Sequence, residues 1–257
     1  MKKIVFMFSR QRSGTNALNS ILNQHNDILC TWEIFDTQCQ NEQYRFFNYI
    51  NKLNKPYLYI ISHKYELFDD FIKFIINSTS KNNIIIDVKY NSINSINSIW
   101  YSHFNSKPVL IKYLYEHDCY VFQLTRKNYL DQYISIIRSN MTKEYTNKSC
   151  NSKNFSFTLD INDFNNFIRA SKAEDEYIRN LLWKSNKFIT LDYYELFDNN
   201  KLSRYAVKVF HEYLNIDGLD NIKSVYNKII KDKYDIINNE NTVRKFCKDN
   251  NYEYFLW

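Results

Sequence analysis

Glycine and proline are scarce in this chain, which has 2 of each among its 257 residues, against ordinary shares of roughly 7% and 5%. No segment rich in proline, glycine and serine divides the sequence, so we expect one domain over residues 1–257. Because glycines are so few, each is informative about the backbone around it. One of them, Gly14, lies in the loop that follows the first apolar run.

Cysteine pairs, long apolar runs and basic blocks are also missing. The 5 cysteines form no C-x-x-C pair, which argues against a zinc site or a disulfide framework. No run approaches the ~18 apolar residues of a membrane-spanning helix, and the apolar stretch before Ser9 is too short for a signal peptide. The net charge is +6, but the sequence contains no long Lys/Arg block, which disfavours a groove that binds nucleic acid. We therefore expect a cytoplasmic protein with no transmembrane segment and no nucleic-acid partner.

Short apolar runs alternate with segments of helical periodicity. The runs typical of buried strands are Ile4–Phe8, Ile28–Trp32, Ile84–Val88, Tyr120–Leu124 and Phe188–Leu191. The helical segments lie at 17–22, 41–80, 107–117, 129–140, 160–183 and 202–214. This alternation predicts an α/β fold with a central parallel sheet of about five strands flanked by helices. Residues 143–158 are expected to form a loop or lid, and residues 217–257 a helical, basic tail.

The loop after the first strand has the features of an anion site. It lies between a buried strand and a helix, so free N–H groups and the helix dipole point at one place. Gly14 allows close backbone approach, Arg12 can bind phosphate oxygens through its planar fork, and Ser13 and Thr15 add hydroxyl donors. The predicted binding residues are Arg10, Gln11, Arg12, Ser13, Gly14, Thr15 and Asn16.

This loop does not match the Walker A pattern. Ser9 stands where the first glycine would be, and no lysine follows Gly14, which disfavours a site for ATP with a metal ion. The simplest alternative is an ordinary strand–helix turn with solvated arginines.

A second candidate phosphate segment follows the fourth strand. Arg126 lies at the carboxyl edge of the sheet, and Ser135 lies on the helix that comes next. A helix packed back along the sheet would bring the hydroxyl toward the guanidinium, and together they would hold a second phosphate. Lys127 is a rival for the role of Arg126. The alternative is a capped helix with an exposed arginine and a core-facing serine.

Together the two segments resemble a known family. Arg12-Ser13-Gly14-Thr15-Asn16-Ala17-Leu18 resembles the 5′-phosphosulfate loop of sulfotransferases that use 3′-phosphoadenosine 5′-phosphosulfate (PAPS). The segment from Leu124 to Ser135 is similar to the 3′-phosphate segment of bacterial carbohydrate sulfotransferases of the trehalose and lipopolysaccharide type. Further similar segments follow the same order: Trp32–Phe35, Ile84–Lys89, Leu191–Leu196 and Phe210–Ile216.

The resemblance extends from about Lys3 to Ile216 and has two departures. The basic loop residue is Arg12, where many relatives have lysine. The spacing from Arg126 to Ser135 is one residue longer than in the animal cytosolic branch, although it fits the bacterial one.

The resemblance implies a P-loop-like sulfotransferase fold and an enzyme that transfers the sulfuryl group of PAPS to an acceptor hydroxyl, with no metal. The acceptor it suggests is a carbohydrate or glycolipid. Arg12 would neutralise the leaving phosphate, Lys89 would steady the sulfuryl oxygens, and Glu33 would be the general base. His63 and His103 are rival bases.

The sequence leaves two other functions open. A nucleotide kinase or other phosphotransferase of the P-loop type would share the strand–loop–helix arrangement but would need the missing lysine. A nucleic-acid-binding protein would cluster aromatic residues with Lys and Arg on an exposed surface. Many aromatic residues of this chain instead fall in runs that look buried.

Overall fold

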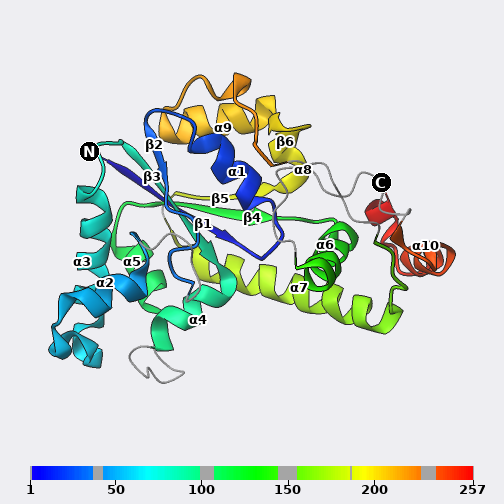
Figure 1. Ribbon diagram of the computed structural model, residues 1–257, viewed down its shortest axis with the longest axis horizontal. Coiled ribbons are helices and arrows are strands. Elements are labelled where there is room, and N and C mark those ends of the chain that lie inside the picture. Colours follow the sequence, from blue (N-terminus) through cyan, green and yellow to red (C-terminus); the bar gives the residue numbers. More distant parts are fainter. Residues whose placement is uncertain are drawn as a thin grey trace.

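The computed structural model describes residues 2–36, 43–98, 107–143, 155–185, 187–226 and 236–256. Its centre is a five-stranded sheet in the order β2-β3-β1-β4-β5, and every pair of neighbouring strands is parallel (Figure 1). The strands are β1 (Lys3–Ser9), β2 (Ile28–Cys30), β3 (Asn83–Lys89), β4 (Tyr120–Thr125) and β5 (Lys187–Asp192). The predicted α/β fold with a five-stranded parallel sheet flanked by helices is confirmed.

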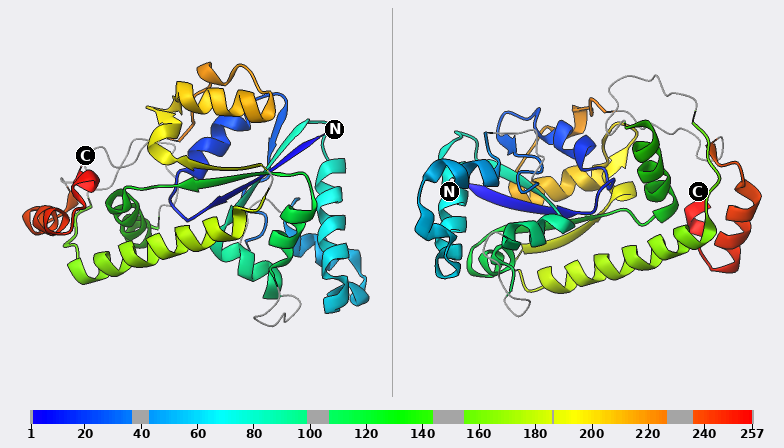
Figure 2. Two further views of the ribbon diagram at one scale, coloured as in Figure 1. Left: turned by 180° about the vertical axis from the view of Figure 1, so that it is seen from behind. Right: turned by 60° about the horizontal axis from the view of Figure 1, so that its bottom comes forward.

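Helices cover both faces of the sheet, and β1 carries apolar side chains on both of its faces. Val5 and Met7 face one layer, which contains α1 (Thr15–Leu22) and α9 (Arg204–Leu214). Phe6 and Phe8 face the other, which contains α3 (Lys64–Asn77), α4 (Tyr90–Ser98), α5 (Val109–Glu116) and the end of α7 (Ile161–Leu182). Figure 2 shows the two layers from behind and from below. Two-sided burial explains why β1 is a continuous apolar run.

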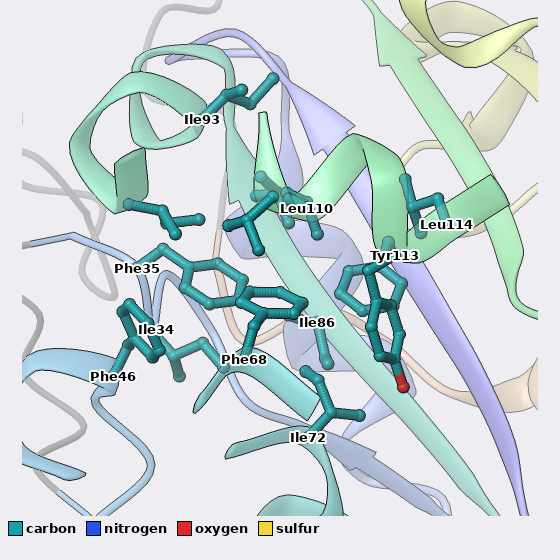
Figure 3. Packing of buried hydrophobic residues seen from close by; sticks show 14 of the residues in the cluster. Ile34, Phe35, Phe46, Phe68, Ile72, Ile86, Ile93, Leu110, Tyr113 and Leu114 are labelled. Carbon is teal, nitrogen blue, oxygen red and sulfur yellow. The ribbon is translucent and has the colours of Figure 1, made fainter. Parts of the chain in front are cut away.

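Aromatic side chains fill the second layer. Phe35 packs against Phe46 and Phe68 with ring centroids 5.7 and 5.9 Å apart, and Tyr113 contacts Phe68 at 5.2 Å (Figure 3). Such ring contacts add to the stability that apolar burial provides. Many of the aromatic residues in this part of the chain therefore serve the core.

The remaining elements extend these layers. Beside the second layer lie α2 (Phe46–Leu53), η1 (Pro56–Tyr59) and η2 (Ile61–His63). A third apolar cluster joins α6 (Tyr129–Thr142) and α7 to α10 (Glu240–Asp249) and η5 (Glu253–Leu256). After β5 come α8 (Tyr193–Leu196), the hairpin β6 (Phe197–Asp198) with β7 (Lys201–Leu202), and η3 (Leu219–Asn221).

Among the element boundaries that differ from the sequence predictions, two have a clear local cause. Trp32 was expected in a strand, but β2 ends at Cys30, and Trp32 has a φ of 62°, which takes the backbone out of the extended region. A helix was expected from Leu202, but α9 begins at Arg204 because the Ser203 hydroxyl caps it.

The tail and the lid are described only in part. The tail is not helical at 222–226, where Lys223 forms a bridge with Lys201. Most of the expected lid, 144–154, and the rival base His103 lie outside the described residues.

The strand order creates a topological switch point beside β1. The chain passes from β1 to β2 and β3 on one side, and later from β4 to β5 on the other. Ser9 is level with Lys89 of β3 and Leu124 of β4. Ligands of such sheets bind beyond the carboxyl ends of the strands at this point. No helix in the described ranges is long and apolar enough to cross a membrane.

Candidate functional site

The loop between β1 and α1 has an unusual backbone. Arg12 and Gly14 both have positive φ values, 65° and 89°, and a positive φ at a residue other than glycine is uncommon and strained. Gly14 is the N-cap of α1, and no side chain of the described residues caps that end. A Cβ atom at position 14 would lie 2.4 Å from the ring of Tyr193. Glycine is therefore required both for the backbone angle and for the close approach of this ring.

Helix α6 holds the loop from the side. The Gln132 amide donates to the carbonyl oxygen of Gln11 at 2.8 Å and to the Ser13 hydroxyl at 3.3 Å. Ser135, three residues later on the same face of α6, accepts a hydrogen bond from Nε of Arg12 at 3.0 Å. The structure thus brings the first predicted phosphate segment and the helix of the second into direct contact.

Arg126 braces the same loop. Its guanidinium donates to the carbonyl oxygen of Arg12 and to Oδ2 of Asp131, each at 3.2 Å, and lies 4.6 Å from the ring centre of Tyr193. The buried Nε of Arg126 has no hydrogen-bond partner among the described residues. Burial lowers the pKa of Arg126, but Tyr194 and Asp131 together raise it above the ordinary arginine value, so the side chain stays charged.

Lys127 points elsewhere. Its backbone N–H donates to Asp192 at 3.1 Å, and its exposed side chain lines an open groove of about 350 Å³ with Lys172 and Arg179 of α7. Of the two rivals for the second phosphate, Arg126 is the one that reaches Arg12.

On the other side of the loop, the Lys89 ammonium contacts side-chain oxygens from several elements. Its ammonium donates to Ser9 at 3.0 Å, to Thr15 at 2.6 Å and to both carboxylate oxygens of Asp87 at 3.1 Å. Oε1 of Glu33 lies 3.4 Å away. The Lys89 side chain is only 3% exposed, whereas that of Glu33 is 33% exposed. Glu33 is therefore the member of this pair that solvent or a substrate can reach.

The environment of Glu33 favours its protonated form. Burial raises the pKa of Glu33 above its ordinary value, Lys89 lowers it, and Asp87 and Asp36 raise it further. The net direction is upward. A carboxylate whose pKa is raised toward neutrality is better suited to accept a proton from a substrate.

Arg10 turns away from the loop. Its guanidinium contacts the hydroxyl and, at 2.5 Å, the carbonyl oxygen of Ser171 on α7, and it pairs with Glu174 at 3.0 Å. Gln11 is exposed and offers its carbonyl oxygen to α6. Asn16 is half-buried in the first turn of α1. The rival base His63 pairs with Glu66 at 2.9 Å at the start of α3 and is not part of the Lys89 cluster.

Several residues of the site were not predicted. They are Asn19, Asp87, Asp131, Gln132 and Tyr193. One signal was present for Asp87, because a carboxylate interrupts the apolar strand Ile84–Val88 two residues before Lys89. Such a residue must be paired when it is buried.

No protein-family model matches the chain, and a search of curated proteins finds no match. Among the described residues, no group of three or more His, Cys, Asp or Glu side chains is arranged to hold a metal ion. Function is therefore inferred from the geometry around the loop.

Proposed function

We propose that this protein is a sulfotransferase that moves the sulfuryl group of PAPS to a hydroxyl of an acceptor, of the carbohydrate or glycolipid class. The observation that carries the proposal is the convergence of Arg12, Ser135 and Arg126 on one loop at the switch point of the sheet. A phosphate at α1 and a second one at α6 would both lie beside this convergence. PAPS presents two such groups on one nucleotide.

The residues present fit that nucleotide. The amino end of α1 carries no side-chain cap from the described residues, and anions bind well at the amino ends of helices. The buried Nε of Arg126 has no hydrogen-bond partner among the described residues, and a second anion bound there would supply one. A hydrogen bond to a charged group is stronger than one between neutral groups. Ser135 adds a hydroxyl beside Arg12.

The chemistry then divides among residues of the chain. When bound, the donor supplies the sulfuryl group, and transfer depends mainly on positioning and on stabilising charge. Glu33 accepts the proton of the acceptor hydroxyl as that oxygen attacks sulfur. Arg12 and the loop N–H groups neutralise the phosphate that leaves. Lys89 has a positioning role: its buried ammonium contacts Ser9, Thr15 and Glu33 and fixes them relative to one another.

Titration with 3′-phosphoadenosine 5′-phosphate (PAP) tests the proposal. We expect millimolar PAP, without added metal, to raise the melting temperature substantially, whereas ADP with Mg²⁺ should do much less. A melting curve that PAP leaves unchanged would contradict the proposed function. Stabilisation by ADP with Mg²⁺ but not by PAP would favour a nucleotide kinase instead.

A further inference from the structure

Asp87 is a fully buried carboxylate behind the Lys89–Glu33 pair. Asp87 and Lys89 are two residues apart on β3, so their side chains leave the same face of the strand. Both carboxylate oxygens of Asp87 lie 3.1 Å from the Lys89 ammonium, and the two side chains are 0% and 3% exposed. Because an unpaired charge is costly to bury, each of these groups depends on the other.

A second bond ties Asp87 to the helix that follows the loop. The side-chain amide of Asn19, itself fully buried on α1, donates to Oδ2 of Asp87 at 3.2 Å. The carboxylate therefore has a defined position relative to α1 as well as to β3. Through Lys89 it is also connected to Ser9 and Thr15 at the two ends of the loop.

The Lys89 ammonium is shared unequally between two carboxylates. It donates to both oxygens of Asp87 at 3.1 Å, whereas Oε1 of Glu33 lies farther away, at 3.4 Å. Among the described residues, the charged groups that face Glu33 are Lys89 and Asp87 from β3 and Asp36 from its own turn. One cation among these carboxylates leaves Glu33 incompletely neutralised.

We propose that Asp87 is a positioning residue for the transfer reaction: it draws the Lys89 ammonium toward β3, so that Glu33 faces the acceptor only partly paired. This role rests on the proposed function, because Glu33 acts as a base only if an acceptor hydroxyl loses its proton there. Asp87 itself touches no substrate. Without it, Lys89 would pair with Glu33 alone, and a carboxylate paired with a cation is a weaker proton acceptor.

A titration of the protein without nucleotide or acceptor tests this role. Protein labelled with ¹³C at the glutamate side-chain carboxyl is followed by NMR as pH changes, and the Glu33 signal is identified by its loss in Glu33→Gln. We expect Asp87→Asn to lower the titration midpoint of Glu33 by about one pH unit or more. The reason is that Lys89 would then pair with Glu33 alone, and a nearby opposite charge lowers the pKa of a carboxyl group. Asparagine can still accept a hydrogen bond from Lys89, which favours a folded variant.

Asp27→Asn is the matched control. Asp27 also accepts hydrogen bonds from asparagine side chains, Asn82 at 2.7 Å and Asn83 at 3.0 Å, but it lies at the amino ends of β2 and β3. This variant loses a structural carboxylate and should leave the Glu33 midpoint unchanged. An unchanged midpoint in folded Asp87→Asn as well would overturn the proposal.

Two further measurements complete the test. If Asp87→Asn does not fold, Asp87→Ser removes the same charge with less bulk and should shift the midpoint in the same direction. In the wild-type protein the Glu33 midpoint should lie above the ordinary 4.5. A wild-type midpoint at or below that value would show full pairing with Lys89 and would overturn the role of Asp87, whatever the variants do.

The same variants separate this inference from the proposed function. If PAP binds and an acceptor is found, the acid limb of the pH–kcat profile should move to lower pH in Asp87→Asn, with PAP affinity nearly unchanged. If PAP does not bind but the NMR midpoint still shifts, Asp87 does set the pKa of Glu33 through Lys89, and the sulfotransferase proposal is wrong. If PAP binds and the midpoint does not shift, only the role of Asp87 fails.

Discussion

Lys89 and Arg126 lie on opposite sides of the same loop, and they are enclosed in different ways. The Lys89 ammonium is surrounded by oxygens of Ser9, Thr15, Asp87 and Glu33 and is 3% exposed. Arg126 contacts the Arg12 carbonyl, Asp131 and the Tyr193 ring and is 10% exposed. Its buried Nε has no hydrogen-bond partner among the described residues.

The difference follows from the two side chains. Lysine carries a compact charge that a cluster of oxygens can surround, whereas arginine presents a planar fork with donors left over for a second partner. The Lys89 side is therefore suited to set the charge of Glu33, and the Arg126 side is suited to bind an anion.

The largest effect is expected at Glu33. Glu33→Gln keeps the shape of the side chain but cannot take up the acceptor proton, and a general base typically contributes ~10²–10⁴-fold to rate. We expect kcat to fall by that order while PAP affinity stays nearly intact. A screen of sugar acceptors with labelled donor precedes the measurement. His63→Ala is the control and should stay within a few-fold of the wild type. Normal turnover by Glu33→Gln, with loss of turnover in a histidine variant, would assign the base to histidine.

The next effect concerns the loop that the two cations share. Gly14→Ala places a methyl group 2.4 Å from the Tyr193 ring at a φ of 89°. At Gly218 the φ is 77°, but among the described residues no atom beyond the chain neighbours lies within 4 Å of an added Cβ. Each alanine incurs about 1–2 kcal/mol for its left-handed backbone, and Gly14→Ala adds an overpacking cost of about 1–3 kcal/mol. Urea unfolding should therefore show a larger loss of stability for Gly14→Ala. Equal losses would mean that Tyr193 does not pack against the loop in solution.

Nucleotide binding should separate Arg126 from Ser135 and Lys127. Arg126→Ala removes a charged contact worth roughly 1.5–3 kcal/mol, and Ser135→Ala a weaker neutral one, so PAP affinity should fall in that order. Lys127→Ala is the matched control, since its side chain lines the α7 groove and should leave affinity nearly unchanged. Adenosine 5′-phosphosulfate lacks the 3′-phosphate and should bind all variants alike. Equal losses for both ligands would show that these residues do not contact the 3′-phosphate.

The fold could be predicted from the sequence where local pattern decides structure. The five strands are apolar runs such as Ile84–Val88, because two covered faces require them. The order β2-β3-β1-β4-β5 was not predicted, since it depends on how crossovers pack over the sheet. Trp32 was misassigned because its strand-forming side chain lies in a turn closed by backbone bonds from Ile34 to Trp32 and from Asp36 to Glu33.

The site could be predicted only as far as the strand ends. A parallel sheet places Arg12, Glu33, Lys89 and Arg126 at one edge whatever the details of packing. Their partners could not be predicted, because pairs such as Asn19–Asp87 join residues that only tertiary packing brings together. The Arg126 environment, with an acidic neighbour five residues along the chain, was equally hidden.

The smallest expected effect concerns that acidic neighbour, and it sharpens the contrast between the two cations. The Asp131 carboxylate accepts one hydrogen bond from Arg126 and one from the Tyr194 hydroxyl. A phosphate bound at Arg126 would therefore lie near this negative charge and be repelled by it. Asp131→Asn keeps an oxygen for both donors but removes the like charge. We therefore expect PAP to bind a few-fold more tightly, and the gain to shrink at high salt, since screening weakens the repulsion that was removed. Isothermal titration at two ionic strengths measures both. Weaker binding at either salt would show that the Asp131 charge is needed to orient Arg126, and the two sides of the loop would then be alike, each with a carboxylate that positions its cation.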